Sequence, residues 1–211
     1  MKTSNEAVLP DHLGGHMNKV HTDRGTLEFL KKEYGIQTMV DVGCGPGDMV
    51  EIANNKGIRA VGVDGDFTLD FGNTPVILHD FTTGPVPLWQ IPSSPIERDP
   101  MQTVPWYHGA VFDLGWSVEF LEHVEERYLP NFMDVFWRCK YVVCTAAPPI
   151  ENDHGHHHVN CQPIEYWIEK FDSYGFDFDK KVTNDIRNMH SNMIKPFMQR
   201  NGMFFVKRKS A

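Results

Sequence analysis

Residues 39–48, MVDVGCGPGD, constrain the fold more than any other stretch of this sequence. An apolar run that is typical of a buried strand leads directly into three glycines and a proline, and a helix start follows. Glycine lets the chain turn sharply with positive φ and leaves bare backbone against which a ligand can lie. The stretch therefore predicts a strand–loop–helix unit with a ligand at the loop.

Apolar runs alternate with helical periodicity along most of the chain, which favours an α/β fold with a largely parallel sheet. One helix is expected to follow the glycines, with Asp48 as its N-cap and Gly57 at its close. Another is expected to have Pro163 at its first position and to end before Gly175. Strands are predicted at residues 38–42, 59–63, 75–78, 110–114, 140–145, 176–180 and 203–207.

The 211 residues are enough for one hydrophobic core, and no change of composition divides them, so we expect a single domain over residues 1–211. Residues 1–20 are expected to be flexible, up to a helix that Thr22 or Asp23 caps. Six prolines interrupt residues 84–109, which predicts a long insertion loop. Three aromatic residues of this loop either cover a pocket, meet a partner or pin the loop to the core: Trp89, Trp106 and Tyr107.

The net charge of −8 argues against general attraction to nucleic acid, and a small acceptor molecule is the simpler expectation. No apolar stretch reaches the roughly 18–20 residues that a membrane helix needs, and the first 20 residues lack the features of a secretion signal. The four cysteines form no CxxC pair and lie in or beside apolar segments, which indicates buried thiols in a reducing compartment. We therefore expect a cytoplasmic protein without a membrane partner, and the sequence leaves its oligomeric state open.

Asp64 ends the second predicted strand, in AVGVDGD. In a parallel sheet this position lies across from the glycine loop, where a carboxylate can accept both hydroxyls of a ribose. A dinucleotide site would need the spacing GxGxxG, whereas these glycines follow GxGxG and Asp48 comes next. Because an acidic residue at the helix start disfavours a pyrophosphate, a nucleoside cofactor without phosphates fits better.

The glycine loop and Asp64 follow one another along the chain as they do in a known family. The stretch VDVGCGPG resembles the first motif of the class I S-adenosylmethionine-dependent methyltransferases, and the resemblance covers nearly the whole chain from about residue 25. Residues 113–124, DLGWSVEFLEHV, are similar to the EVLEHV signature of the small-molecule, UbiG-like branch, the methyltransferase type 11 pattern. The resemblance implies a Rossmann-like, seven-stranded, mostly parallel sheet with helices on both faces and an antiparallel C-terminal edge hairpin. It also implies an enzyme that uses S-adenosylmethionine and releases S-adenosylhomocysteine.

The resemblance assigns the cofactor-binding residues as well. The glycine loop would lie under the methionine part and the ribose, Asp41 would hold the amino group, and Asp64 would take the ribose hydroxyls. The string HDF, residues 79–81, falls where the family places groups near adenine, and the residues after the fourth strand lie beside the cofactor. The full predicted set is Asp41, Gly43, Cys44, Gly45, Gly47, Asp64, Asp80, Phe81, Trp116 and Ser117.

Glu119, Glu122 and His123 fall at i, i+3 and i+4, so a helix that starts near residue 118 would present all three on one face. Together they would orient a base, brace the helix or bind a divalent metal. The small-RNA 3′-end 2′-O-methyltransferases use a similar Glu-x-x-Glu-His arrangement plus a later histidine as metal ligands, and residues 153–160, DHGHHHVN, offer such a histidine. Of these roles we expect bracing, and no metal site.

A histidine cluster precedes the helix at Pro163, and an imidazole with a pKa of about 6.5 can accept a hydroxyl proton at neutral pH. We expect His157, His123 and Glu119 to form the catalytic set, although a surface loop with structural hydrogen bonds is the alternative role for the cluster. The predicted function is methyl transfer to a hydroxyl of a small molecule or sugar. The alternatives are metal-assisted 2′-O-methylation of an RNA end and a non-catalytic S-adenosylmethionine-binding protein.

Overall fold

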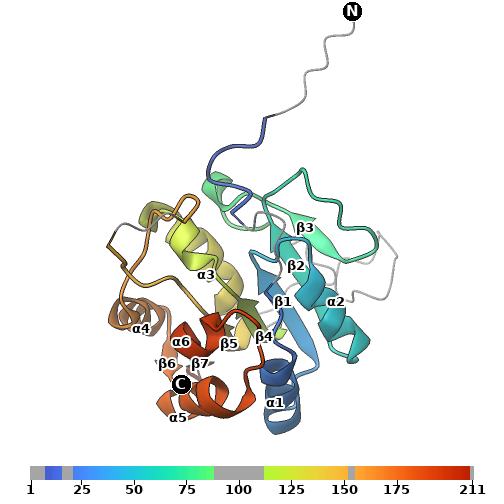
Figure 1. Ribbon diagram of the computed structural model, residues 1–211, viewed down its shortest axis with the longest axis vertical. Helices are drawn as coiled ribbons and strands as arrows, with labels where there is room; N and C mark the ends of the chain where they lie inside the picture. Colours follow the sequence, from blue (N-terminus) through green and yellow to red (C-terminus); the bar gives the residue numbers. More distant parts are fainter. Residues whose placement is uncertain (1–7, 16–20, 88–111, 152–154, 210–211) are drawn as a thin grey trace, which may run out of the picture.

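A computed structural model describes residues 8–15, 21–87, 112–151 and 155–209 of the chain. Its seven strands form one mixed sheet in the order β3-β2-β1-β4-β5-β7-β6 (Figure 1). Strand β7 runs antiparallel to its neighbours β5 and β6, whereas the other pairs are parallel. The predicted α/β fold with an antiparallel C-terminal edge is confirmed. The strands are β1 (Thr38–Val42), β2 (Arg59–Asp64), β3 (Val76–Leu78), β4 (Phe112–Ser117), β5 (Cys139–Cys144), β6 (Phe176–Phe178) and β7 (Met203–Lys207).

Helices cover both faces of this sheet. Alternate residues of a strand point to opposite faces, and accordingly Val40 and Val42 enter one hydrophobic core while Met39 enters the other. The first core contains buried side chains of α3 (Leu129–Trp137) and α4 (Ile164–Ser173). The second contains side chains of α1 (Arg24–Tyr34), α2 (Asp48–Asn55), α5 (Lys180–Asp185) with the π-helical turn Ile186–His190, and α6 (Phe197–Asn201). The sheet is therefore the middle of three layers.

The helix starts differ from the predictions in small ways. Gly47, with φ of 91°, is the N-cap of α2, so Asp48 is the first helical residue and not the cap. Pro163 is the N-cap of α4 and precedes its first residue, Ile164. Strand β4 continues to Ser117, beyond the predicted end at residue 114, because residues 114–117 keep the parallel register with β5.

The predicted helix from residue 118 is wrong. Glu119 has φ of 52°, a left-handed conformation that an α-helix cannot include. Short 3-10 turns at Leu121–His123 and Glu126–Tyr128 follow, and the helix α3 begins only at Leu129. Glu119, Glu122 and His123 consequently do not lie on one face of a helix.

Two predicted segments fall largely outside the described residues. Of the loop at residues 84–109, the structure describes residues 84–87, in which Val86 is buried, and Trp89, Trp106 and Tyr107 lie outside. Of residues 1–20, the structure describes residues 8–15. Among the described residues, no helix has both the length and the hydrophobicity of a membrane span.

A buried aspartate at the start of α1 joins two distant parts of the chain. Asp23 is fully buried and caps α1 by accepting a hydrogen bond from the Thr26 backbone N–H, at 3.0 Å. The same carboxylate accepts from the Thr26 and Ser191 hydroxyls and from the Asn192 backbone N–H. One carboxylate thus fixes the helix start and the turn at residues 191–192 together.

We expect Asp23→Ala to lower the free energy of unfolding by about 2–3 kcal/mol, because a lost helix cap costs about 1 kcal/mol and the other buried donors lose their acceptor. Urea unfolding followed by circular dichroism measures the change. Glu169→Ala, on the exposed side of α4, is the matched control and should shift the midpoint little. Equal midpoints for the two variants would refute the structural role of Asp23.

Candidate functional site

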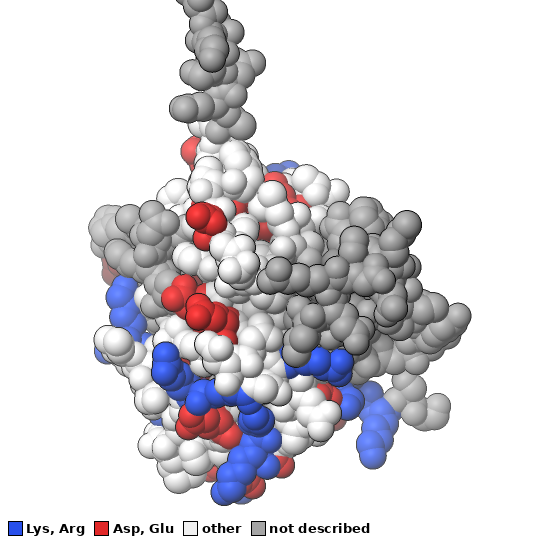
Figure 2. Space-filling view, turned by 90° about the vertical axis from the view of Figure 1, so that its right-hand side faces the viewer, with Lys and Arg blue, Asp and Glu red and all other residues white. Residues whose placement is uncertain are grey.

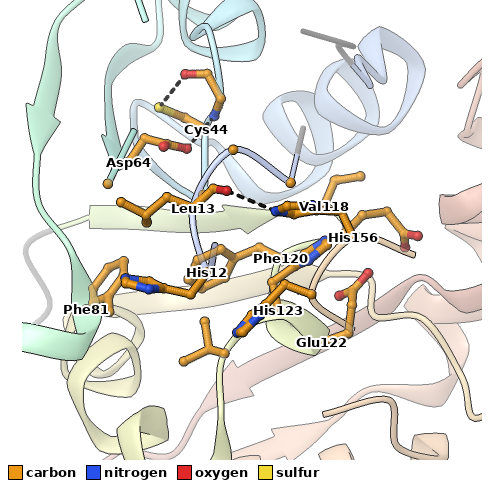
Figure 3. A pocket seen from close by; sticks show the side chains of 18 of the residues that line it. His12, Leu13, Cys44, Asp64, Phe81, Val118, Phe120, Glu122, His123 and His156 are labelled. Atoms are coloured by element: carbon orange, nitrogen blue, oxygen red, sulfur yellow. Dashed lines mark hydrogen bonds between the residues drawn. The ribbon is translucent and has the colours of Figure 1, made fainter. Parts of the chain in front are cut away.

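A cavity of about 330 Å³ lies at the carboxyl ends of β1, β2 and β4 (Figure 3). Ligands of open α/β sheets bind at this end, where loops after the strands supply the contacts. Most of the predicted site residues line the cavity: Asp41, Gly43, Cys44, Gly45, Asp64, Asp80, Phe81, Trp116, Glu119, His123 and His157. The structure therefore brings together residues that are far apart in the sequence.

The glycine loop after β1 has the backbone that the sequence predicts. Gly43, Gly45 and Gly47 have φ of 72°, 53° and 91°, in the region that favours glycine. A Cβ on Gly43 would stand 2.3 Å from the Phe120 ring, so a larger residue has no room there. The N–H groups of Gly43 and Cys44 donate to the Val63 carbonyl at 2.9 and 3.3 Å, which ties the loop to β2.

Asp64, at the end of β2, is bonded directly to this loop. Its Oδ2 accepts a hydrogen bond from the Gly45 N–H at 2.7 Å, and its Oδ1 accepts one from the Asp66 N–H at 2.9 Å. Figure 3 shows Asp64 beside the loop segment at Cys44. The carboxylate and the bare backbone therefore border the cavity together.

Burial changes the acidity of two groups at the same edge. Asp41 is only 4% exposed, and this burial, together with the nearby charge of Asp64, raises the pKa of its carboxyl well above the usual range. Burial, with smaller effects of Asp41 and Asp64, also raises the pKa of the Cys44 thiol. The thiol is therefore protonated at neutral pH and serves as an apolar wall, not as a nucleophile.

Asp80 and Phe81 follow β3 and form another wall. The Asp80 Oδ2 accepts a hydrogen bond from the His12 Nε2 at 2.8 Å, and its Oδ1 accepts from the Thr82 N–H. Burial raises the pKa of Asp80, but the hydrogen bonds from His12 and Thr82 outweigh it and leave that pKa below its usual value. Phe81 is buried and packs against Phe120, with ring centroids 5.7 Å apart.

Of three further predicted cofactor residues, one lines the cavity and two do not. Trp116, on β4, is 1% exposed and lines it. Ser117 lies outside the lining, and its hydroxyl donates to the Val42 carbonyl at 2.9 Å, which links β4 to β1. Gly47 also lies outside the lining, and a Cβ there would stand 2.8 Å from Thr74.

Thr145 holds Glu119 in its left-handed conformation. The Glu119 N–H donates to the Thr145 hydroxyl at 2.9 Å, and that hydroxyl donates to the Glu119 Oε1 at 2.8 Å. Burial raises the pKa of Glu119, while the hydrogen bond from Thr145 and the nearby His158 and Lys195 oppose this rise. Glu119 thus reaches the cavity from a turn and not from a helix.

Glu122, His123 and His158 form a cluster in which one possible ligand atom from each side chain lies within 4.8 Å of those of the other two. The Glu122 side chain is fully buried. Its backbone carbonyl accepts the N–H groups of Val159 and Asn160 at 3.0 and 2.9 Å, which joins the histidine loop to the turn at residues 121–123. The sequence had grouped Glu122 and His123 with Glu119, whereas the structure groups them with His158.

Two histidines that line the cavity, His123 and His157, are less basic than usual. Burial, followed by the nearby His158, lowers the pKa of His123 to about 4, so this ring is neutral at pH 7. Burial, followed by His12, lowers the pKa of His157, which has a left-handed φ of 47° and lines the cavity. Neutral imidazoles can accept a proton or ligate a cation.

The cavity also contains residues that the sequence did not single out. His12 and Leu13 reach it from the N-terminal segment, and Lys195 and Phe197 reach it from the chain around α6. Sequence periodicity gave no signal for them, because none lies on a predicted strand end and His12 stands 68 residues from its partner Asp80.

Comparison with solved structures identifies the fold. A TehB-like S-adenosylmethionine-dependent methyltransferase from Corynebacterium glutamicum is similar over 87% of this chain and 88% of its own, with 15% identity and a TM-score of 0.53. Magnesium protoporphyrin IX methyltransferase from Synechocystis, solved with bound S-adenosylhomocysteine, matches 92% of this chain and 84% of its own, with 13% identity and a TM-score of 0.52.

The methyltransferase domain of bacterial CtHen1 is also similar, over 88% of this chain and 96% of its own, with 15% identity and a TM-score of 0.51. No family model matches the sequence, and no curated protein is similar to it by sequence. The sheet order and these structural likenesses agree with the resemblance in the sequence motifs. The chain has the fold of the class I S-adenosylmethionine-dependent methyltransferases.

Proposed function

We propose that this protein transfers a methyl group from S-adenosylmethionine to a hydroxyl of a small molecule or sugar. The observation that carries the proposal is the contact between Asp64 and the Gly45 N–H at the edge of the cavity. It sets a carboxylate beside bare backbone at the carboxyl ends of two adjacent parallel strands, which suits a nucleoside without phosphates.

The residues around this contact supply suitable partners for each part of the cofactor. Asp64 would accept the ribose hydroxyls, and the buried Asp41 carboxylate would pair with the amino group, whose positive charge offsets the cost of its burial. Asp80 and Phe81 would face the adenine, as a polar group and an aromatic edge. Trp116, a buried residue that lines the cavity, would exclude water from the reacting end.

The proposed acceptor site is the end of the cavity lined by Glu119, Glu122, His123 and the histidine loop, which we call the acidic and histidine-rich end. Bound S-adenosylmethionine would supply a methyl group activated on a sulfonium; transfer to the acceptor oxygen would break the methyl carbon–sulfur bond and leave S-adenosylhomocysteine. His157 would take the hydroxyl proton, because its neutral imidazole lines the cavity. Glu119, held by Thr145, would orient the acceptor, so the enzyme contributes mainly position and proton removal.

The cluster of Glu122, His123 and His158 favours a second candidate, metal-assisted 2′-O-methylation of an RNA end. Two imidazoles and a carboxylate are the donor set of many catalytic zinc sites and suit other transition metals. Ligand atoms of a tetrahedral site with metal–ligand distances of about 2.0–2.2 Å lie about 3.3–3.6 Å apart, so these atoms, which lie within 4.8 Å of one another, would have to move closer by up to about 1.5 Å to hold an ion. Glu122, His123 and His158 would hold a divalent cation there, and such a cation would act as a Lewis acid that lowers the pKa of an acceptor hydroxyl.

The visible surface gives the RNA candidate less support. Figure 2 shows basic side chains on the lower part of one face, with acidic side chains between them. Ion pairs join opposite charges elsewhere in the chain as well, such as the pair of Lys56 with Glu28. Mixed charge of this kind attracts a phosphate backbone weakly, which leaves a small hydroxyl acceptor as the first candidate.

We expect Asp64→Asn to weaken binding of S-adenosylhomocysteine at least tenfold, because a lost charge-assisted hydrogen bond costs about 1.5–3 kcal/mol. Isothermal titration calorimetry measures the dissociation constant. Asp70→Asn, an exposed residue six positions later, is the matched control and should bind as the wild type does. Equal affinity for both variants would reject the proposed place of the ribose.

We expect labelled S-adenosylmethionine to pass its methyl group to at least one hydroxyl acceptor in a screen of sugars, small alcohols and phenols. His157→Gln should then lower kcat about 100-fold or more, with binding of S-adenosylhomocysteine retained, because general-base catalysis contributes that much. A protein that binds the product tightly and methylates nothing, including RNA ends, would instead be the non-catalytic binder.

The metal-assisted candidate predicts that the wild type binds a divalent cation and loses activity on chelation. Co²⁺ titration followed by visible absorption measures binding directly, and Glu122→Gln should weaken it roughly tenfold or more. His157→Gln, in the same loop but outside the cluster, should keep the cation. Full activity in the presence of a chelator, together with no Co²⁺ spectrum, would exclude this candidate.

A further inference from the structure

Residues 8–15, which we call the strap, lie across the cavity at the proposed cofactor and acceptor ends. A turn shapes the strap, with the Leu13 N–H donating to the Pro10 carbonyl at 3.0 Å. Gly14 has φ of 78°, a left-handed conformation that turns the chain again. Figure 3 shows Leu13 and His12 among the residues that surround the cavity. The strap thus belongs to the site although it lies far from it in sequence.

One contact of the strap is made at the proposed adenine end. The His12 Nε2 lies 2.8 Å from the Asp80 Oδ2, and both side chains are partly buried. Asp80 also accepts the Thr82 N–H, so its carboxylate is held from two sides. This bond fixes the strap to the wall that follows β3.

A second contact fills a gap left by a glycine. Gly65 follows Asp64 directly, and a Cβ on Gly65 would stand 2.6 Å from the Leu13 Cδ2, which is too close for a side chain. The same point lies 3.3 Å from the Asp80 Cα. The Leu13 side chain therefore occupies the space beside Gly65 that a side chain at position 65 would otherwise fill.

Further contacts are made at the acceptor end. The Leu13 carbonyl accepts a hydrogen bond from the His156 Nε2 at 3.1 Å, and a Cβ on Gly15 would stand 3.0 Å from the His123 ring. The strap therefore bridges the loop after β3 and the histidine loop, two segments that border opposite ends of the cavity.

The strap forms a wall of the cavity and does not fill it. His12, Leu13, Gly14 and Gly15 are all among the lining residues, and about 330 Å³ remains open with the strap in place. That volume is in the range of small-ligand sites, roughly 300–1,000 Å³. A ligand bound in this cavity would contact the strap, because His12 and Leu13 are among its lining residues.

We propose that residues 8–15 are a lid that closes over bound S-adenosylmethionine and opens for the exchange of cofactor and product. This inference rests on the proposed function. The lid is tied down by a few hydrogen bonds at a partly exposed surface, which suits a segment that opens and closes during turnover. Closure would protect the reacting methyl group from water and join the cofactor site to the acceptor site.

Stopped-flow fluorescence with S-adenosylhomocysteine tests the lid on the full chain. We expect His12→Ala and Leu13→Ala each to raise the dissociation rate constant about tenfold and to change the association rate constant little, because the lid acts after the ligand has entered. Val8→Ala is the matched control within the strap, since Val8 is 89% exposed and outside the lining, and it should behave as the wild type.

Three outcomes would overturn the proposal in different ways. Unchanged dissociation in both variants would show that the strap does not retain the ligand. Tighter binding in either variant would show that the strap competes with the ligand instead of closing over it. A wild type that binds no S-adenosylhomocysteine would reject the proposed function itself, and the lid with it.

Hydrogen exchange provides a readout that does not depend on the variants. In the wild-type chain, S-adenosylhomocysteine should slow exchange of the strap amides severalfold, while amides of β7 at the far side of the sheet stay unchanged. Equal or faster exchange of residues 8–15 in the bound state would contradict closure.

Discussion

The hydrogen bond from the Gly45 N–H to the Asp64 carboxylate joins the ends of two adjacent parallel strands, and the geometry of the site depends on it. The glycine loop can approach Asp64 because Gly43 and Gly45 adopt left-handed conformations, and it is held there by the Val63 carbonyl. Phe120 then packs on the bare Gly43, which brings the loop after β4 to the same edge. This contact therefore joins the glycine loop to Asp64 at the edge where β1, β2 and β4, aligned by their parallel pairing, border a common cavity.

The acidic and histidine-rich end of the cavity is assembled differently. Its residues come from irregular segments whose positions are fixed by backbone hydrogen bonds between distant loops. Thr145, after β5, sets the conformation of Glu119, and the Glu122 carbonyl holds the chain at residues 159–160. Because no helix carries these side chains, their arrangement depends on the sheet that lies beneath both loops. This is a rigid support for chemistry, since both loops start from adjacent strands.

The strap connects the two ends. His12 contacts Asp80 at one end, and the Leu13 carbonyl contacts His156 at the other. A cofactor and an acceptor bound beneath the two ends of such a lid would each favour its closed position, so their affinities would be coupled through it. The same closure would keep water from the buried carboxylates, whose charges act more strongly in a dry site.

The sequence alone determined the sheet, because continuous apolar runs typical of buried strands, separated by segments of helical periodicity, follow from local geometry. It also predicted the glycine loop and Asp64, since both stand at the ends of recognisable strands. It did not predict the turn at Glu119, whose left-handed φ depends on a hydroxyl 26 residues away, and so it placed three side chains on a helix that does not form. Nor did it predict the contact of His12 with Asp80, and it left open which histidine of residues 153–160 would join Glu122 and His123. Those arrangements were decided by the tertiary structure, because only the folded sheet brings such distant segments to one edge.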